Sequence, residues 1–194
     1  LGVFILWFCW FGFNGASTVG MDSDELIESA SLVFFNTNLA AAVATFAAMA
    51  FTWIRYGKPD VSMTFNAALA GLVGITAGCD ALDAVGATVV GIVSGILVVV
   101  VVEVLDLKLH IDDPVGAVGV HCANGIWGTI AVGLLANPDA PAGLRGLLYT
   151  GSARQLGLQL LGFVSVAAWA AVTMTLFFLL LKKLNFLRAD EADE

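Results

Sequence analysis

The sequence predicts an all-α protein that spans a membrane several times. Of its 194 residues, 59% are hydrophobic and only 12% are charged, whereas a typical soluble domain is about 45–50% apolar and about 25% charged. The apolar residues fall in long runs, and a membrane-spanning helix needs roughly 20 mostly apolar residues. The net charge is −8 with only 8 Lys and Arg, which leaves no basic surface for a nucleic acid.

The apolar runs are separated by short polar segments that mark the helix ends. Gly57 and Pro59 are expected to end the second helix. Asp113 followed by Pro114 is typical of a helix N-terminus, with the carboxylate as cap and proline in the first turn. The predicted helices cover residues 1–15, 30–54, 62–77, 83–105, 115–136 and 153–184, and residues 185–194 form a tail. The segments 21–28 and 106–113 are then polar loops.

The last predicted helix has no charge from Gln155 to Leu181. Its roughly 30 residues would measure about 45 Å at 1.5 Å per residue, which exceeds a hydrocarbon core of about 30 Å, so we expect it to cross obliquely. Most of the basic residues fall on one side of the six spans, and the positive-inside rule therefore puts the C-terminus in the cytoplasm. The basic residues on that side are Arg55, Lys58, Lys108, Lys182, Lys183 and Arg188, against Arg145 and Arg154 on the other.

Small residues recur at the four-residue spacing that lets membrane helices approach closely. Examples are Gly91 and Gly95 in the fourth helix and the alanines at 40, 44 and 48 in the second. We interpret these stripes as packing surfaces of a tight bundle.

Polar side chains inside the apolar helices are few, and a functional role is the default hypothesis for them. For Asn36, Asn38, Asn66 and Thr129 the preferred interpretation is a hydrogen bond between helices. His121 lies seven residues after Pro114, roughly 10 Å into the fifth helix. A neutral imidazole both donates and accepts a hydrogen bond, which suits a narrow path for a small polar molecule or a proton. The alternative is a structural histidine bonded to a backbone carbonyl.

The helix carrying His121 would place small residues beside the ring, since Ala117 and Gly125 share its face. Aromatic residues also crowd the first helix, at positions 7, 8, 10, 11 and 13. They fit either an aromatic belt at the membrane interface or a cation site, and composition favours the belt.

Nothing in the sequence predicts an enzyme. Cys9, Cys79 and Cys122 show no metal-binding spacing, and no nucleophile–base pair or cofactor loop is evident. The chain begins within an apolar run, without Met or a basic segment, and is expected to be part of something longer.

Four blocks resemble signatures of the ammonium transporter (Amt/Mep/Rh) family. They are WFGFNGAS at Trp10–Ser17, FNTNLAAA at Phe35–Ala42, NAALAGLVGITAGC at Asn66–Cys79 and DDPVGAVGVHCANGIWGT at Asp112–Thr129. The segments QLGLQLLG at Gln155–Gly162 and LRA at Leu187–Ala189 resemble its end. The resemblance implies the eleven-helix fold of that family, of which this chain would be helices six to eleven, the second five-helix inverted repeat and the long final helix.

The resemblance also implies roles for individual residues. Trp10 and Ser17 correspond to an outer recruitment site for ammonium, and Phe13 to one of two phenylalanines that close the outer pore. His121 corresponds to one of two paired pore histidines. We also expect Ala117, which shares its helix face, and the intramembrane hydroxyl of Thr76 at this pore. The other gate and pore residues of the family belong to its first half.

Partners and function follow from the resemblance as expectations. Ammonium or ammonia would be carried across a cell membrane by a homotrimer without a cofactor, and a PII-type regulatory protein would bind the cytoplasmic face. The alternatives are an ammonium sensor of the same fold, or a non-conducting fragment that needs the missing half. The sequence leaves open whether charged ammonium or neutral ammonia moves.

Overall fold

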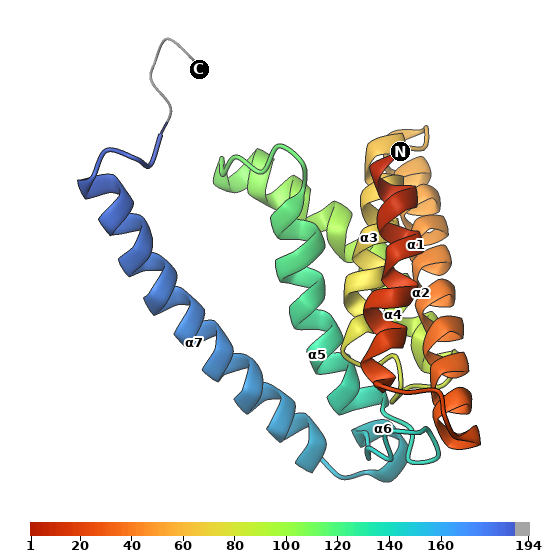
Figure 1. The fold of residues 1–194 in the computed structure, drawn as a ribbon. Helices are drawn as coiled ribbons and strands as arrows, with labels where there is room; N and C mark the ends of the chain where they lie inside the picture. The colour runs from red at the N-terminus through yellow and green to blue at the C-terminus, as the bar shows by residue number, and fades with distance from the viewer. Residues whose placement is uncertain (189–194) are drawn as a thin grey trace. The chain divides into compact units, whose positions relative to one another are not determined.

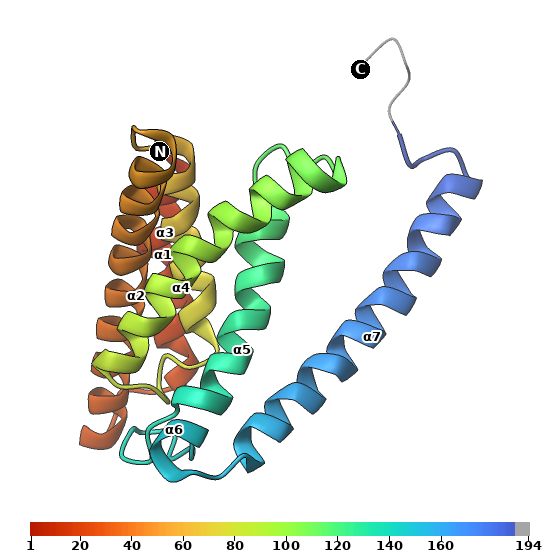
Figure 2. The same cartoon turned by 180° about the vertical axis from the view of Figure 1, so that it is seen from behind.

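The computed structural model describes residues 1–188, and every regular element among them is helical. This confirms the predicted all-α class. The chain divides into two compact units, Leu1–Gln159 and the segment from Leu160 onward. In the first unit α1 to α5 run side by side as a bundle, with the short α6 at one end of it (Figures 1 and 2).

The first two helices are joined by a short turn. Helix α1 spans Gly2–Gly15, a 3₁₀ turn follows at Ala16–Thr18, and α2 spans Asp24–Tyr56. Helix α2 begins six residues before the predicted 30–54 because Ser23 accepts a hydrogen bond from the Leu26 amide. The acidic residues of its first turn also favour the helix N-terminus. Gly57 ends the helix with φ of 74°, as predicted.

The third and fourth helices each begin at an aspartate cap. Asp60 accepts from the Met63 amide at the start of α3, Val61–Thr76. Asp83 accepts from the Gly86 amide at the start of α4, Ala84–Glu103. Helix α4 continues as a π-helix over Val104–Leu109, into the segment predicted to be a loop, and ends at His110 in the left-handed conformation.

The predicted fifth helix, 115–136, begins later and in a different form. A turn at Gly116 with φ of 71° separates Pro114 from the first helical residue. A π-helix then covers Val118–Ala123, and α5 covers Asn124–Leu135. The N-cap residue is Ala117 and not the predicted Asp113, although the Asp113 carboxylate does accept a hydrogen bond from the Val118 amide at 3.0 Å. Pro114 does not occupy the first helical turn, contrary to the prediction.

Glycine lets the helices of the bundle touch. A Cβ on Gly95 of α4 would lie 2.3 Å from the Ala44 carbonyl oxygen of α2, and one on Gly128 of α5 would lie 2.2 Å from the Gly74 oxygen of α3. Ala44 and Gly95 belong to the predicted small-residue stripes, which therefore do form helix contacts.

The chain then passes through a loop and the short α6, Leu147–Thr150, into α7, Arg154–Lys183. The loop is pinned to the bundle by the Asn137 amide, which donates to the Ala81 oxygen at 2.9 Å. Four helical segments of the described chain are long and apolar enough to cross a membrane, Asp24–Tyr56, Ala84–Leu109, Val118–Leu135 and Arg154–Lys183, and α3 is shorter. The oblique course of the last helix stays a prediction. Of the predicted tail, residues 189–194 lie outside the described part.

Candidate functional site at the α1–α2 end of the bundle

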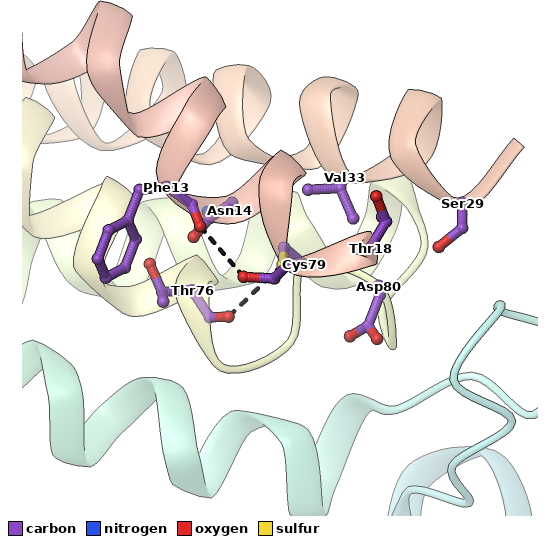
Figure 3. A pocket seen from close by; sticks show the side chains of 9 residues that line it. Phe13, Asn14, Thr18, Ser29, Val33, Thr76, Cys79 and Asp80 are labelled. Atoms are coloured by element: carbon purple, nitrogen blue, oxygen red, sulfur yellow. Dashed lines mark hydrogen bonds between the residues drawn. The ribbon is translucent and has the colours of Figure 1, made fainter. Parts of the chain in front are cut away.

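A cavity of about 280 Å³ opens where α1 ends, α2 begins and α3 ends. Four of its nine lining residues carry hydroxyl groups, and the others supply an aromatic ring, an amide, an aliphatic side chain, a thiol and a carboxylate. Its lining residues are Phe13, Asn14, Ser17, Thr18, Ser29, Val33, Thr76, Cys79 and Asp80. Three residues that the sequence predicted for the transport path, Phe13, Ser17 and Thr76, therefore share one cavity. Figure 3 shows Phe13 and Thr76 toward one side of it and Ser29 and Asp80 toward the other.

The Ser17 hydroxyl is oriented to accept hydrogen bonds from a ligand. It donates its own hydrogen to the Phe13 carbonyl oxygen one turn earlier, at 3.1 Å. A hydroxyl whose hydrogen is engaged retains two lone pairs. Ser17 is exposed, so these lone pairs can meet a donor that enters the cavity.

Trp10 lies behind the cavity wall. Its indole N–H donates to Thr76 Oγ1 at 2.9 Å, and that hydroxyl donates to the Leu72 carbonyl oxygen at 2.7 Å. The Trp10 ring also tilts against Phe13, with the ring centres 5.4 Å apart. Trp10, predicted for the recruitment site, and Thr76, predicted for the pore, are thus direct hydrogen-bond partners.

His121 and Ala117 lie away from this cavity. Both side chains are exposed on the surface of this chain, His121 within the π-helix and Ala117 just before it. Because that helix begins at Val118, His121 stands in its first turn and not roughly two turns inside, as the sequence suggested. A Cβ on Gly125 would meet nothing within 4 Å, so open space does lie beside this part of α5.

The π-helical turn that carries His121 is stabilised by the side chain of Asn124, which follows directly after it in the chain. The Asn124 side chain is fully buried, and its Nδ2 donates to the Gly119 carbonyl oxygen at 2.9 Å. An i→i+5 turn of this kind is rare and occurs often at functional sites. The sequence carries no signal for this role of Asn124.

The other polar residues of the helices differ in their hydrogen-bond partners. Asn36 Nδ2 donates to the carbonyl oxygens of Cys79 and Leu82, at 3.0 and 2.7 Å, and so ties α2 to the loop after α3. Asn66 Nδ2 donates to the Val115 oxygen at 3.3 Å. Thr129 instead donates to Gly125 of its own helix, so its predicted bond between helices is wrong. Asn38 is exposed.

The sequence missed several residues of the cavity wall. Thr18, Ser29, Val33 and Cys79 line it without having been predicted for the site, and Asp80 lines it as part of the acidic loop Asp80–Asp83, whose carboxylates are expected to concentrate cations outside the membrane. The only available signal was the acidic character of the loop that contains Asp80. Burial, together with the charge of Asp80, raises the pKa of the Cys79 thiol to about 11.

The second carboxylate of that loop, Asp83, has a structural role. Besides capping α4 it accepts hydrogen bonds from Asn137 Nδ2, at 3.0 Å, and from the Tyr149 hydroxyl. Burial opposes its ionisation, but these bonds and the Gly86 amide hold the pKa of Asp83 below its usual range. The hydrogen bond to Asp83 raises the pKa of Tyr149 to about 12.

These features define the class: an all-helical membrane protein with a hydroxyl- and aromatic-lined cavity at one end of a tight bundle. The model of the Ammonium Transporter Family matches residues 1–194, and the chain belongs to that family. It is therefore a multi-pass membrane protein of a family of transporters.

The similar proteins are ammonium transporters by name. The ammonium transporter Amt2 of Archaeoglobus fulgidus is 42% identical over 202 residues, which cover all of this chain and 42% of that protein. A putative ammonium transporter of Synechocystis is 39% identical over 196 residues and 41% of its length. The chain thus spans about two fifths of the length of these relatives.

The chain is also similar in structure to solved Amt and Mep2 proteins. A structure described as a sensor Amt protein superposes with a TM-score of 0.85 at 37% identity, over 97% of this chain and 44% of that one. Mep2 of Candida albicans superposes with a TM-score of 0.85 at 32% identity, over 98% and 42% respectively.

Proposed function

We propose that this chain forms part of a transporter that recruits ammonium at the α1–α2 end of the bundle and passes it through a histidine-lined pore. The observation that carries the proposal is the cavity, in which Phe13, Ser17 and Thr76 meet and behind which Trp10 is bonded to Thr76. The ammonium transporters to which the chain is similar support the substrate.

The residues of the cavity suit a small cation that donates hydrogen bonds. Ser17 offers lone pairs, and the Phe13 ring, with 65% of its surface exposed, offers a π face. Transfer of ammonium from water into an apolar pore is unfavourable, because the desolvation free energy of an isolated charge is large. In the proposed mechanism the ion loses its proton beyond Phe13. The pore histidines, of which His121 is one, take up and relay this proton, while neutral ammonia passes His121 and Ala117.

The proposed setting is a cell membrane, with the cavity outside and the C-terminus in the cytoplasm. The proposed assembly is a homotrimer in which the pore of each subunit is completed by a first repeat of helices. A PII-type protein is proposed to bind the cytoplasmic face, at the loops 55–60 and 108–113 and at the tail.

A sensor of ammonium is the second candidate. The superposition on the sensor Amt protein at 37% identity favours it. Binding at the cavity is common to both candidates, and they differ in whether ammonium crosses the membrane.

Ammonium-dependent current in liposomes that contain the intact protein tests the proposal. We expect current in the unaltered protein, and loss of current or of selectivity over potassium in His121→Ala, because the pore loses a hydrogen-bond donor and acceptor. Unchanged ammonium and potassium currents in His121→Ala would refute its place in the pore. Binding of ammonium without any current would favour the sensor.

A further inference from the structure

One carboxylate, Asp80, stands among the nine residues that line the cavity. Its polar neighbours in the wall are neutral and include the hydroxyls of Ser17, Thr18, Ser29 and Thr76. The Asp80 carboxylate is thus the one acidic side chain in direct reach of a cation inside the cavity, and its attraction extends further than a hydrogen bond.

The backbone around Asp80 is fixed from two directions. On one side the fully buried Asn36 donates to the carbonyl oxygens of Cys79 and Leu82, the residues that flank the turn. On the other side the Ala142 amide donates to the Asp80 carbonyl oxygen at 3.1 Å. The carboxylate is therefore presented from a rigid turn, and little conformational entropy is lost when it meets a ligand.

The carboxylates of Asp80 and Asp83 differ in what engages them. The Asp83 oxygens accept hydrogen bonds from Gly86, Asn137 and Tyr149. No Lys or Arg among residues 1–187 forms an ion pair with the Asp80 carboxylate. Asp80 is half-buried and faces the cavity, and its charge is felt inside, since it contributes to the raised pKa of Cys79.

We propose that the Asp80 carboxylate is a cation-binding group of the cavity, which raises its occupancy by ammonium. This inference rests on the proposed function and adds to it a residue that sets affinity. Figure 3 places Asp80 on the side away from Phe13 and Thr76. Asp80 therefore attracts the cation into the cavity, and the hydroxyls and the Phe13 ring hold it afterwards.

The test is the concentration dependence of ammonium current in liposomes that contain the intact protein, with Asp80→Asn as the variant. Asparagine keeps the shape and removes the charge. We expect the half-saturating concentration to rise about threefold to tenfold at low ionic strength, as for one unit charge at a few ångströms in a wet site. Added choline chloride should shrink this difference, because salt screens exposed charges. Potassium should also inhibit Asp80→Asn less than the unaltered protein.

Two further variants separate the effect of the Asp80 charge from a change in the shape of the turn and from a general loss of negative charge. Asp80→Glu restores the charge and should restore most of the affinity. Asp139→Asn removes an exposed charge from a neighbouring loop that does not line the cavity, and should behave as the unaltered protein. Size-exclusion profiles in detergent check that each variant folds.

Three results would overturn the inference: an unchanged half-saturating concentration in Asp80→Asn, an equal change in Asp139→Asn, or a change that salt does not reduce and Asp80→Glu does not reverse. The last would mean that Asp80 only supports the turn. A failure of the proposed function itself looks different, since the unaltered protein would then give no ammonium current.

Discussion

At the residue scale, Ser17 and Phe13 are joined by a hydrogen bond but should act at different steps. In the proposed function Ser17 binds the cation, so Ser17→Ala should raise the half-saturating ammonium concentration. A hydrogen bond to a charged group contributes about 1.5–3 kcal/mol, and each 1.4 kcal/mol is tenfold. Because the site is wet and water can replace the hydroxyl, we expect about tenfold.

Phe13→Ala should instead change the maximal current or admit water, with affinity nearly kept, because the ring is proposed to obstruct the path. Current against ammonium concentration in the intact protein measures both variants. If Ser17→Ala changed only the maximum and Phe13→Ala only the half-saturation, the two roles would be reversed.

Cys79 gives a second prediction at this scale, on reactivity. The thiol has 7% of its surface exposed and a pKa of about 11, so at pH 7.5 the thiolate is on the order of 0.03% of the total. In a variant whose other cysteines are replaced by alanine, maleimide labelling of Cys79 should be slow at pH 7.5 and accelerate up to about pH 11. Asp80→Asn should speed labelling at pH 9, since it removes a charge that raises this pKa. Fast labelling of folded protein at pH 7.5 would contradict the burial.

The sequence could predict the chemistry of individual residues better than their neighbours. Trp10, Phe13 and Ser17 were singled out in one block and Thr76 in another, but no spacing could show that Trp10 donates to Thr76. Asp80 and Asp83 look alike in the sequence. Only the folded loop shows that the Asp83 carboxylate oxygens accept hydrogen bonds from other parts of the protein, while the Asp80 carboxylate faces the cavity.

At the element scale, close helix contact predicts strong effects of small substitutions. Gly95→Ala would place a methyl group 2.3 Å from the Ala44 oxygen, so α2 and α4 must separate. Overpacking of this kind costs about 1–3 kcal/mol. Thermal unfolding in detergent should show a lower midpoint for Gly95→Ala. Gly157→Ala in α7 is the matched control, because its added Cβ meets nothing within 4 Å, and it should unfold no earlier than the unaltered protein.

Helices were predictable where local signals agree, and not where the fold decides. Apolar length marks the ends of α3 and α4 to within two residues, and Gly57 marks the end of α2, whereas α2 begins six residues before its predicted start. The π-helical turns have no comparable signal. The one at Val118–Ala123 depends on the positive φ of Gly116 and on the buried Asn124 side chain, which is known only once α5 has packed.

At the scale of the whole molecule, the proposed pore needs a second wall besides the one that this chain would supply. Its length is about two fifths of the ammonium transporters that it matches, and His121 and Ala117 are exposed on its surface. In a membrane this face would meet lipid, where an unpaired imidazole is disfavoured. The face is therefore expected to need a covering chain.

This leads to the last prediction: residues 1–194, reconstituted alone in liposomes, should give no ammonium current. Co-expression with the first five helices of a related transporter as a separate chain should restore it, because those helices supply the other wall and the second histidine that the family resemblance implies. His121→Ala in this chain should abolish the restored current, which shows that it passes through the shared pore. Ammonium current from residues 1–194 without any other chain would contradict the half-pore view. Current on co-expression that survives His121→Ala would mean that the added helices conduct by themselves.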